Sequence, residues 1–315
     1  MEGVVVTGGS GKAGRAVIQD LLDHGYAVLN VDIAAPVKPL CHFIKADLTD
    51  MGQTIDVLRH AAGTIDRKRA PVARPDKVIH LAGIPAPGLA PDTVTFANNM
   101  ISTHNLFSAA TLLGLSRVVW ASSETVFGLP FTRTPPVFAP ATEVQPPAPE
   151  TSYALAKSLC EEMARQMHRW NPATSFVGLR LSNIFEAADY AQIPSFWDDP
   201  ALRRWNLWSW VDSRDAAQAC RLALQADSPG AEIFTIAAAD TLMTRPSRDL
   251  MADQFPAVPL MEPLGEFETL LSIDKAGKLL GYTPLHSWRD QIKPADGSWR
   301  PGSAAASVEA GGHET

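Results

Sequence analysis

A glycine-rich string near the start of the chain limits most strongly what this sequence can fold into. Val4-Val5-Val6 is a short apolar run typical of a buried strand, and Thr7-Gly8-Gly9-Ser10-Gly11-Lys12-Ala13-Gly14 follows it directly. From Ala13 to Asp23 the apolar residues recur at helical spacing. Glycines in a strand-to-helix turn let backbone N–H groups and the helix N-terminus face a phosphate. We expect a pyrophosphate site formed by Gly8, Ser10, Gly11, Lys12, Ala13 and Gly14.

The same alternation of strand and helix continues through the first half of the chain. Further strands are predicted at 27–32, 42–45, 77–82, 117–121 and 176–181, and helices at 55–62, 92–113 and 152–170. Such alternation implies a parallel sheet covered by helices on both faces. The predicted fold class is α/β: a Rossmann-like doubly wound parallel sheet with a smaller C-terminal substrate-binding lobe.

The composition of the later segments sets the expected domain limits. Residues 1–182 form the predicted NAD(P)-binding Rossmann domain, which includes a loop at 129–149 with seven prolines. Residues 183–295 form the predicted substrate lobe, within which 211–237 is expected to return to the Rossmann sheet. There Asp212 is expected to cap a helix that runs to Ala226, with Asp215 in capping-box spacing. The Ala-, Gly- and Ser-rich tail at 296–315 is predicted to be disordered.

Asp32 is the second feature of the sequence that indicates a dinucleotide cofactor. It ends the second predicted strand, 18 residues after Gly14. A carboxylate at this place in a dinucleotide fold binds the ribose hydroxyls and repels a 2′-phosphate, so NAD is the expected cofactor. Lys12 could instead contact that phosphate, which leaves NADP open.

A tyrosine and a lysine one helical turn apart indicate acid–base chemistry. Tyr153 and Lys157 are four residues apart on a predicted helix and therefore share one face. A nearby ammonium favours the phenolate and is expected to lower the pKa of Tyr153, so that it exchanges a proton with a substrate hydroxyl. Ser123 ends the fifth predicted strand, where the carboxyl ends of parallel strands gather an active site. Without Ser123, the pair would more often be a solvated helix face.

Charge and composition narrow the class of partner. The 315 residues carry a formal net charge of −7, with a sequence pI near 5.6, which argues against nucleic acid or an anionic membrane. The three cysteines are far apart in the sequence and form no metal-binding spacing, so no metal is expected. No leader segment and no apolar run of ~20 residues stands out. We expect a cytoplasmic protein with a small-molecule substrate.

These motifs together resemble the extended short-chain dehydrogenases/reductases, which include the NAD-dependent epimerase/dehydratase family. The glycine string, Asp32, Ala46-Asp47-Leu48, His80-Leu81-Ala82-Gly83, Asn98-Asn99, Ser122 to Gly128 and Tyr153-x-x-x-Lys157 occur in the family's order. Later matches extend the resemblance to Pro284. The resemblance implies a homodimer paired through helices 92–113 and 152–170.

The resemblance also implies roles for single residues. Ser123 would bind the substrate oxygen, Tyr153 would be the acid/base, and Lys157 would hold the nicotinamide ribose. Asn99 would stabilise the active-site helix, whereas His80 is expected to pack. Asp47 and Leu48 would meet the adenine, and Leu81, Ala82 and Gly83 would line the cofactor. Glu124 and Asn183 are expected to contact the substrate, and Trp208 is expected either to contact it or to pack in the second lobe or a subunit contact.

Departures from the family pattern favour one reaction. Thr125 stands where the dehydratases carry a carboxylate base, which disfavours dehydration. Only 26 residues separate Asn183 from Trp210, and we expect Arg203 and Arg204 there to be surface charges rather than phosphate ligands. We therefore predict an NAD-dependent oxidoreductase acting on a small sugar, sugar acid or related alcohol. Two alternatives stay open: a nucleotide-sugar epimerase with retained NAD, and a non-catalytic NAD(P)-sensing protein.

Overall fold

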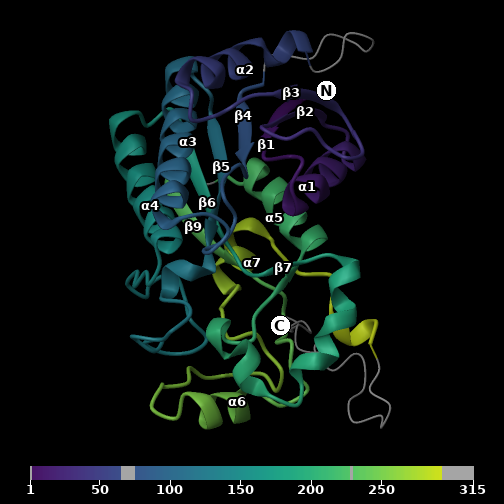
Figure 1. Ribbon diagram of the computed structural model, residues 1–315, viewed down its shortest axis with the longest axis vertical. Coiled ribbons are helices and arrows are strands. Elements are labelled where there is room, and N and C mark those ends of the chain that lie inside the picture. Colours follow the sequence, from purple (N-terminus) through teal and green to yellow (C-terminus); the bar gives the residue numbers. More distant parts are fainter. Residues whose placement is uncertain (1, 65–74, 228–229, 293–315) are drawn as a thin grey trace, which may run out of the picture.

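A seven-stranded, fully parallel sheet forms the centre of the molecule (Figure 1). The computed structural model describes residues 2–64, 75–227 and 230–292. The strand order is β3-β2-β1-β4-β5-β6-β9, so the order reverses between β1 and β4. The strands are β1 (Gly3–Thr7), β2 (Ala27–Asp32), β3 (His42–Lys45), β4 (Lys77–His80), β5 (Arg117–Ser123), β6 (Ser175–Leu181) and β9 (Ala231–Ile236).

Helices cover both faces of this sheet, which makes it a doubly wound α/β fold. In Figure 1, α2, α3 and α4 lie on one face, and α1 and α5 lie on the other. The bounds are α1 (Lys12–Asp23), α2 (Met51–Thr64), α3 (Asp92–Leu113), α4 (Ser152–Trp170) and α5 (Ser213–Gln225). The predicted fold class is confirmed.

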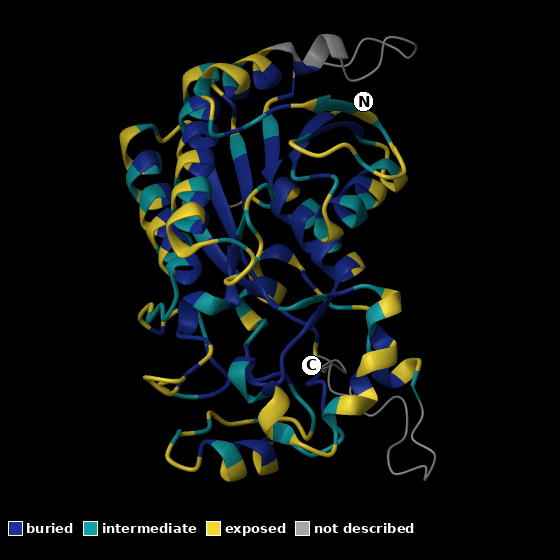
Figure 2. Cartoon of the chain, in the orientation of Figure 1, coloured by how far each residue is buried: buried dark blue, intermediate teal, exposed yellow. Residues whose placement is uncertain are grey.

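Side chains that alternate along each strand build the two cores. Val4 and Val6 pack with α1 and α5, whereas Val5 between them packs with α2 and α3. On the α3 side, Phe107 meets the Trp120 ring edge-on, with ring centroids 5.6 Å apart. Figure 2 shows the central strands as the most deeply buried part of the chain, whereas the edge strand β3 is partly exposed. Because helices bury these strands on both faces, the strand residues form continuous apolar runs in the sequence.

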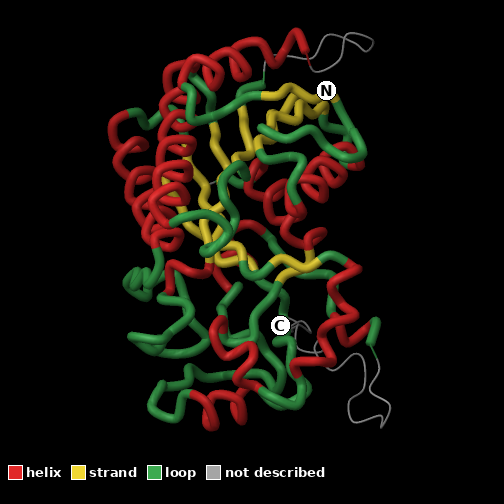
Figure 3. The backbone as a smooth tube through the Cα atoms, in the orientation of Figure 1, coloured by secondary structure: helices red, strands yellow, loops and turns green. Residues whose placement is uncertain are grey.

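The chain leaves the sheet after β6 and returns to it with β9. The intervening and later segments contain short helices joined by long loops (Figure 3). Strand β7 pairs with β8 in a separate parallel ribbon. The remaining elements of the structure are η1 (Glu124–Phe127), which follows β5, and β7 (Ile184–Phe185), η2 (Ala187–Phe196), η3 (Pro200–Asn206), β8 (Val211–Asp212), α6 (Ser247–Gln254), α7 (Asp274–Leu280) and η4 (Trp288–Asp290).

The proline-rich stretch at 129–149 contains no helix and no extended strand, as predicted. It is tied down by single bridges from Ala139 to Leu260 and from Ala141 to Leu271. The tail predicted to be disordered, 296–315, lies outside the described residues. Within the described parts of the chain, no helix has the length and apolar character needed to cross a membrane.

The structure corrects three local predictions. Helix α2 begins at Met51 rather than at Ile55, and β4 ends at His80 rather than at Ala82. Asp212 caps α5 as expected, since its side chain accepts a hydrogen bond from the Arg214 N–H. The capping-box role predicted for Asp215 is wrong, because its carboxylate instead accepts backbone N–H bonds from a distant segment at Leu285.

Candidate active site

One large cavity opens at the carboxyl ends of the central strands. Its volume is about 1160 Å³, which exceeds the ~300–1,000 Å³ of an ordinary small-molecule pocket. The cavity extends from the glycine-rich turn, across the point where the strand order reverses, to the segment after β6. That switch point is where ligands bind in open α/β sheets. All the predicted cofactor residues line it: Gly8, Ser10, Gly11, Lys12, Ala13, Gly14, Asp32, Asp47, Leu48, Leu81, Ala82, Gly83, Tyr153 and Lys157.

The glycine-rich turn has the shape that a pyrophosphate needs. Gly8 adopts a φ of +72°, and a Cβ added there would lie 2.5 Å from the backbone nitrogen of Ala82. A Cβ at Gly14 would overlap the carbonyl oxygen of Gly8. Helix α1 starts at Lys12, and no side chain caps its first N–H groups. Side chains are thus kept away from an open helix N-terminus, and these residues fit the phosphates of a dinucleotide.

Two carboxylates stand at the far end of this half of the cavity. Asp32 accepts hydrogen bonds from the Ser10 N–H (3.0 Å) and the Ala34 N–H (3.1 Å), one on each oxygen. Asp47 accepts from both the N–H and the hydroxyl of Thr49, at 2.9 and 2.7 Å. Backbone and side-chain donors therefore fix both carboxylates in place at the cavity wall.

Ser123, Tyr153 and Lys157 meet in the other half of the cavity. Ser123 is the last residue of β5, and its Oγ accepts from the N–H and the hydroxyl of Thr125, at 3.2 and 3.0 Å. Tyr153 is in the first turn of α4, whose N-terminus is capped by Thr151. Lys157 lies one turn later, with its Nζ 5.7 Å from the centre of the Tyr153 ring.

Burial, rather than the neighbouring ammonium, dominates the acidity of this tyrosine. It raises the pKa of Tyr153 to about 12, and hydrogen bonding to Ser123 offsets only part of that effect. Burial also lowers the pKa of Lys157, whose Nζ donates to the carbonyl oxygen of Ala121 at 2.6 Å. Burial thus outweighs any effect of the Lys157 ammonium, and the prediction of a lowered pKa for Tyr153 is wrong.

Asn99 lies behind the cavity wall rather than on it, and Asn98 lines the cavity instead. The Asn99 side chain accepts from the Ile84 N–H at 2.8 Å and donates to the Ile84 carbonyl oxygen at 3.0 Å. It thereby holds the loop after β4 against α3. His80 is buried between Thr7 and Thr103, and desolvation lowers its pKa to about 3, so it packs.

The segment 197–210 contains four tryptophans, and the structure contradicts the prediction made for one of them, Trp208. Trp208 does not reach the cavity: it is fully buried and donates its indole N–H to the Pro200 carbonyl oxygen at 2.7 Å. Its ring packs edge-on against Phe255, so its prediction as a substrate contact is wrong. Among the described residues that line the cavity, Trp205 is the one tryptophan from this segment.

Arg203 was expected at the surface, and it is buried instead. Its side chain is 8% exposed, and its guanidinium lies over the rings of Phe185, Phe196 and Trp205. Its Nη2 donates to Asn183 Oδ1 at 2.9 Å. Arg204 is partly exposed and lies over the ring of Phe255.

The structure adds residues that sequence reasoning missed. Thr125 and Thr151 line the cavity beside Ser123 and Tyr153, and Ser182 lines it beside Glu124. Thr125 and Ser182 could have been found, because Thr125 lies two residues after Ser123 and Ser182 directly follows the predicted strand 176–181. Thr151 caps α4, and only tertiary packing brings it to the cavity.

Comparison with known proteins identifies a family for this chain. The model of the NAD dependent epimerase/dehydratase family matches residues 4–237. UDP-glucose 4-epimerase 3 of Oryza sativa subsp. japonica is 30% identical over 201 residues, which cover 57% of this chain and 48% of that protein. The chain thus spans about half the length of the curated relatives it matches.

Solved structures show the same fold at low identity. UDP-glucose 4-epimerase of Thermotoga maritima with UDP-glucose has a TM-score of 0.66 at 19% identity, covering 90% of this chain and 94% of that one. A mutated uronate dehydrogenase has a TM-score of 0.63 at 22% identity, covering 92% and 85%. The family match covers most of the sheet and its cavity, which confirms the predicted family. The chain belongs to the NAD dependent epimerase/dehydratase family.

Proposed function

We propose that this protein is an NAD-dependent dehydrogenase of a small sugar, sugar acid or related alcohol. The observation that carries the proposal is the meeting of Ser123, Tyr153 and Lys157 in the cavity that also contains the glycine-rich turn. A dinucleotide laid along this cavity would have its phosphates at Gly11 and its adenosine ribose at Asp32. The reacting carbon of the substrate would then lie beside Ser123.

Residues of the chain itself would bind the substrate oxygen and transfer the proton of the substrate hydroxyl. Bound NAD supplies the hydride acceptor and, in its oxidised form, a positively charged ring. The Ser123 hydroxyl would bind the substrate oxygen, and the Tyr153 hydroxyl would exchange a proton with it. Because burial keeps Tyr153 protonated in the free protein, oxidation of an alcohol needs positive charge nearby to favour the phenolate. The Lys157 ammonium, above the same ring, would supply part of that charge.

The segment after β6 supports a small substrate. It consists of the β7–β8 ribbon and two short helices, η2 and η3. Most of its large aromatic side chains are buried in clusters that it shares with other segments, such as those of Phe255 and Trp288. An epimerase must hold its keto intermediate while the sugar turns over, which requires a strong remote anchor such as a nucleotide diphosphate. Among the described residues that line the cavity, the lysines and arginines are Lys12, beside the glycine-rich turn, and Lys157, beside Tyr153. This lining favours a dehydrogenase.

A nucleotide-sugar epimerase with retained NAD is the second candidate. The sequence relatives favour it, since those that match at 28–30% identity are UDP-glucose 4-epimerases. Such an enzyme would recycle its cofactor and release no NADH.

The reaction products decide between the two. The protein would be incubated with NAD and a panel of free sugars, sugar acids and polyols, and NADH would be followed by its absorbance. Separate samples would contain UDP-glucose or UDP-galactose and would be examined for the epimer. Stoichiometric NADH from a free substrate supports the dehydrogenase, whereas an epimer formed without net NADH overturns it.

The assembly we propose is a homodimer that pairs α3 and α4 with the same helices of a second copy. Ile101 on α3 and Leu155 and Leu159 on α4 are apolar and exposed, at 46%, 42% and 41%. Apolar side chains grouped on neighbouring helices favour such pairing. Sedimentation velocity would test it, with Leu155→Glu as the variant expected to dissociate the dimer.

A further inference from the structure

A buried carboxyl group stands next to the reacting serine. Glu124 directly follows Ser123, is 3% exposed and lines the cavity. It is the first residue of η1, the short helix that begins where β5 ends. Charged side chains are seldom placed in such an interior without a partner or a function.

Neutral hydrogen-bond donors hold this carboxyl group. The Ser182 hydroxyl donates to Oε2 at 2.5 Å, and the Asn206 amide donates to Oε1 at 3.4 Å. The described residues place no arginine or lysine nitrogen within ion-pairing distance of it. Burial raises the pKa of Glu124 to about 7, against the opposing effect of those donors, of the Asn183 backbone N–H and of Arg203. A carboxylate has about four acceptor sites, and these hydrogen-bond donors occupy only part of them, so the group can accept a further hydrogen bond from a ligand.

Asn183 adds a second polar group to the same wall. Its side-chain oxygen accepts from Arg203 at 2.9 Å, which fixes the orientation of its amide. Its Nδ2 is thereby left as the group that can donate to a ligand. Arg203 itself is not among the lining residues, because Phe185, Phe196 and Trp205 surround its guanidinium.

The two lysines of the lining are already engaged. Lys12 Nζ lies 2.6 Å from the carboxylate of Asp189, and Lys157 Nζ donates to the Ala121 carbonyl oxygen at the same distance. A substrate anion placed beside Glu124 would meet a carboxyl group instead of a cation. Like charges in a partly desolvated site repel strongly.

We propose that Glu124 and Asn183 form a hydroxyl-recognition site that selects an uncharged, polyhydroxylated substrate over one carrying a carboxylate or a diphosphate. The Glu124 carboxylate accepts a hydrogen bond from a substrate hydroxyl, and the Asn183 amide donates one to a neighbouring oxygen. This inference rests on the proposed dehydrogenase and narrows its substrate to the neutral members of that class.

A matched pair of substrates isolates the charge. D-galactose carries a CH₂OH group where D-galacturonate carries a carboxylate. The value of kcat/KM for NADH formation is measured with each at a pH well above 7, where the Glu124 carboxyl group is ionised. The wild type is expected to favour the neutral sugar by about tenfold or more, which corresponds to ~1.4 kcal/mol. Glu124→Gln keeps the size of the side chain and removes its charge, so it should reduce this ratio by about tenfold. Glu162→Gln, on the exposed face of α4, is the matched control and should leave the ratio unchanged.

A binding measurement keeps the inference testable without turnover. Isothermal titration of the protein saturated with NADH compares the two ligands in a complex that cannot oxidise them. Tighter binding of the neutral sugar, lost in Glu124→Gln, supports the site. Tighter binding of galacturonate by the wild type, or a preference unchanged in Glu124→Gln, overturns it. Absence of NADH from every free substrate, together with the expected binding preference, would refute the dehydrogenase and leave the hydroxyl site in place.

Discussion

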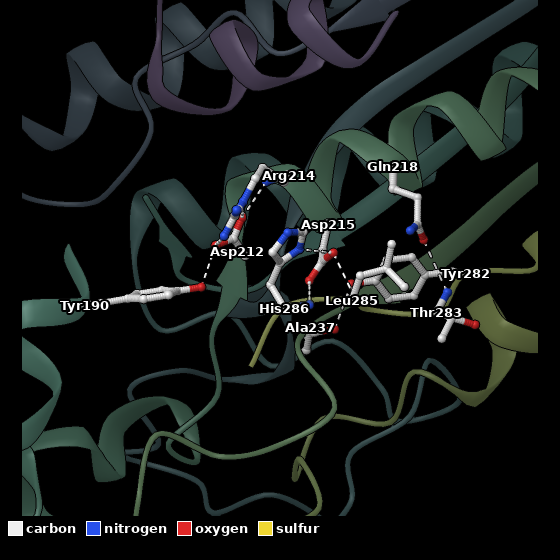
Figure 4. Close-up of polar contacts among 10 residues, drawn as sticks. All are labelled: Tyr190, Asp212, Arg214, Asp215, Gln218, Ala237, Tyr282, Thr283, Leu285 and His286. Carbon is white, nitrogen blue, oxygen red and sulfur yellow. Dashed lines mark hydrogen bonds and ion pairs between the residues drawn. The ribbon is translucent and has the colours of Figure 1, made fainter. Parts of the chain in front are cut away.

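The Asp215 carboxylate accepts a hydrogen bond from the Nδ1 of His286, 2.8 Å away and 71 residues later in the chain (Figure 4). The same carboxylate also accepts the backbone N–H groups of Leu285 and His286, each at 3.0 Å. Nearby, the Tyr282 hydroxyl donates to the Ala237 carbonyl oxygen at the end of β9. One side chain in the first turn of α5 therefore fixes the last described segment of the chain against the sheet.

The first prediction concerns this anchor. Asp215→Ala leaves two backbone N–H groups in a partly buried place without an acceptor, so the free energy of unfolding should fall by roughly 2–4 kcal/mol. Removal of the imidazole alone, by His286→Ala, loses one of the three hydrogen bonds and should cost about 1 kcal/mol. Urea unfolding followed by tryptophan fluorescence gives both values. Equal losses in the two variants would show that the backbone bonds contribute little.

The second prediction concerns the proton carrier. Tyr153→Phe keeps the ring and removes the hydroxyl, so turnover should fall by ~10²–10⁴ while the dissociation constant for NAD stays unchanged. Tyr26→Phe is the matched control, because its hydroxyl accepts only a surface hydrogen bond from Gln225 in the described structure. Steady-state kinetics and NAD titration measure the two effects. Near-normal turnover in Tyr153→Phe would exclude Tyr153 as the acid/base.

The third prediction concerns cofactor choice. Backbone N–H groups of Ser10 and Ala34 hold the Asp32 carboxylate at the cavity wall, where it would repel the 2′-phosphate of NADP. The wild type should bind NAD more tightly than NADP, and Asp32→Ala should reduce that ratio by about tenfold. Asp23→Ala, an exposed carboxylate on α1, is the control with no expected change. Dissociation constants from fluorescence titration test this, and tighter NADP binding by the wild type contradicts it.

Local patterns predicted most of the sheet and the cofactor half of the cavity. A buried parallel strand is a continuous apolar run, and a glycine-rich turn needs its glycines at fixed spacing, so both leave their pattern within a few residues. Gly8 and Gly14 show why: each lies where any side chain would overlap the backbone of the same turn or of the adjacent loop.

Tertiary packing decided the residues that were predicted wrongly. Arg203 is adjacent to a second arginine in the sequence, which is typical of a surface, yet three aromatic rings surround its guanidinium. Trp205 lies within η3 and lines the cavity, whereas Trp208 lies just past the end of η3 and packs against Phe255. Asp215 has the spacing of a capping box, but a backbone segment 70 residues away supplies its donors instead.

The last prediction concerns Glu124 and the pH dependence of stability. Its pKa is raised by burial from 4.5 to about 7, so the folded protein holds a proton on this group that the unfolded chain has already lost. Where the folded state binds more protons, stability falls as the pH rises. The stabilising effect is thus fully present below pH 4.5 and is lost as the pH rises through about 7. Arg203 and Tyr153 are the charged and titratable groups that interact with it, and both remain in Glu124→Gln.

In Glu124→Gln this loss should be absent. The difference in free energy of unfolding between variant and wild type should therefore rise by roughly 3 kcal/mol from pH 4.5 to pH 7, at ~1.4 kcal/mol for each pKa unit. Glu162→Gln is a control of opposite sign, because hydrogen bonds from Gln166 and Arg165 lower the pKa of that exposed carboxylate. Urea unfolding at a series of pH values gives both differences. A difference for Glu124→Gln that does not change with pH would mean that the group ionises in the cavity as it does in water, because the carboxyl would then be solvated rather than buried beside Ser123.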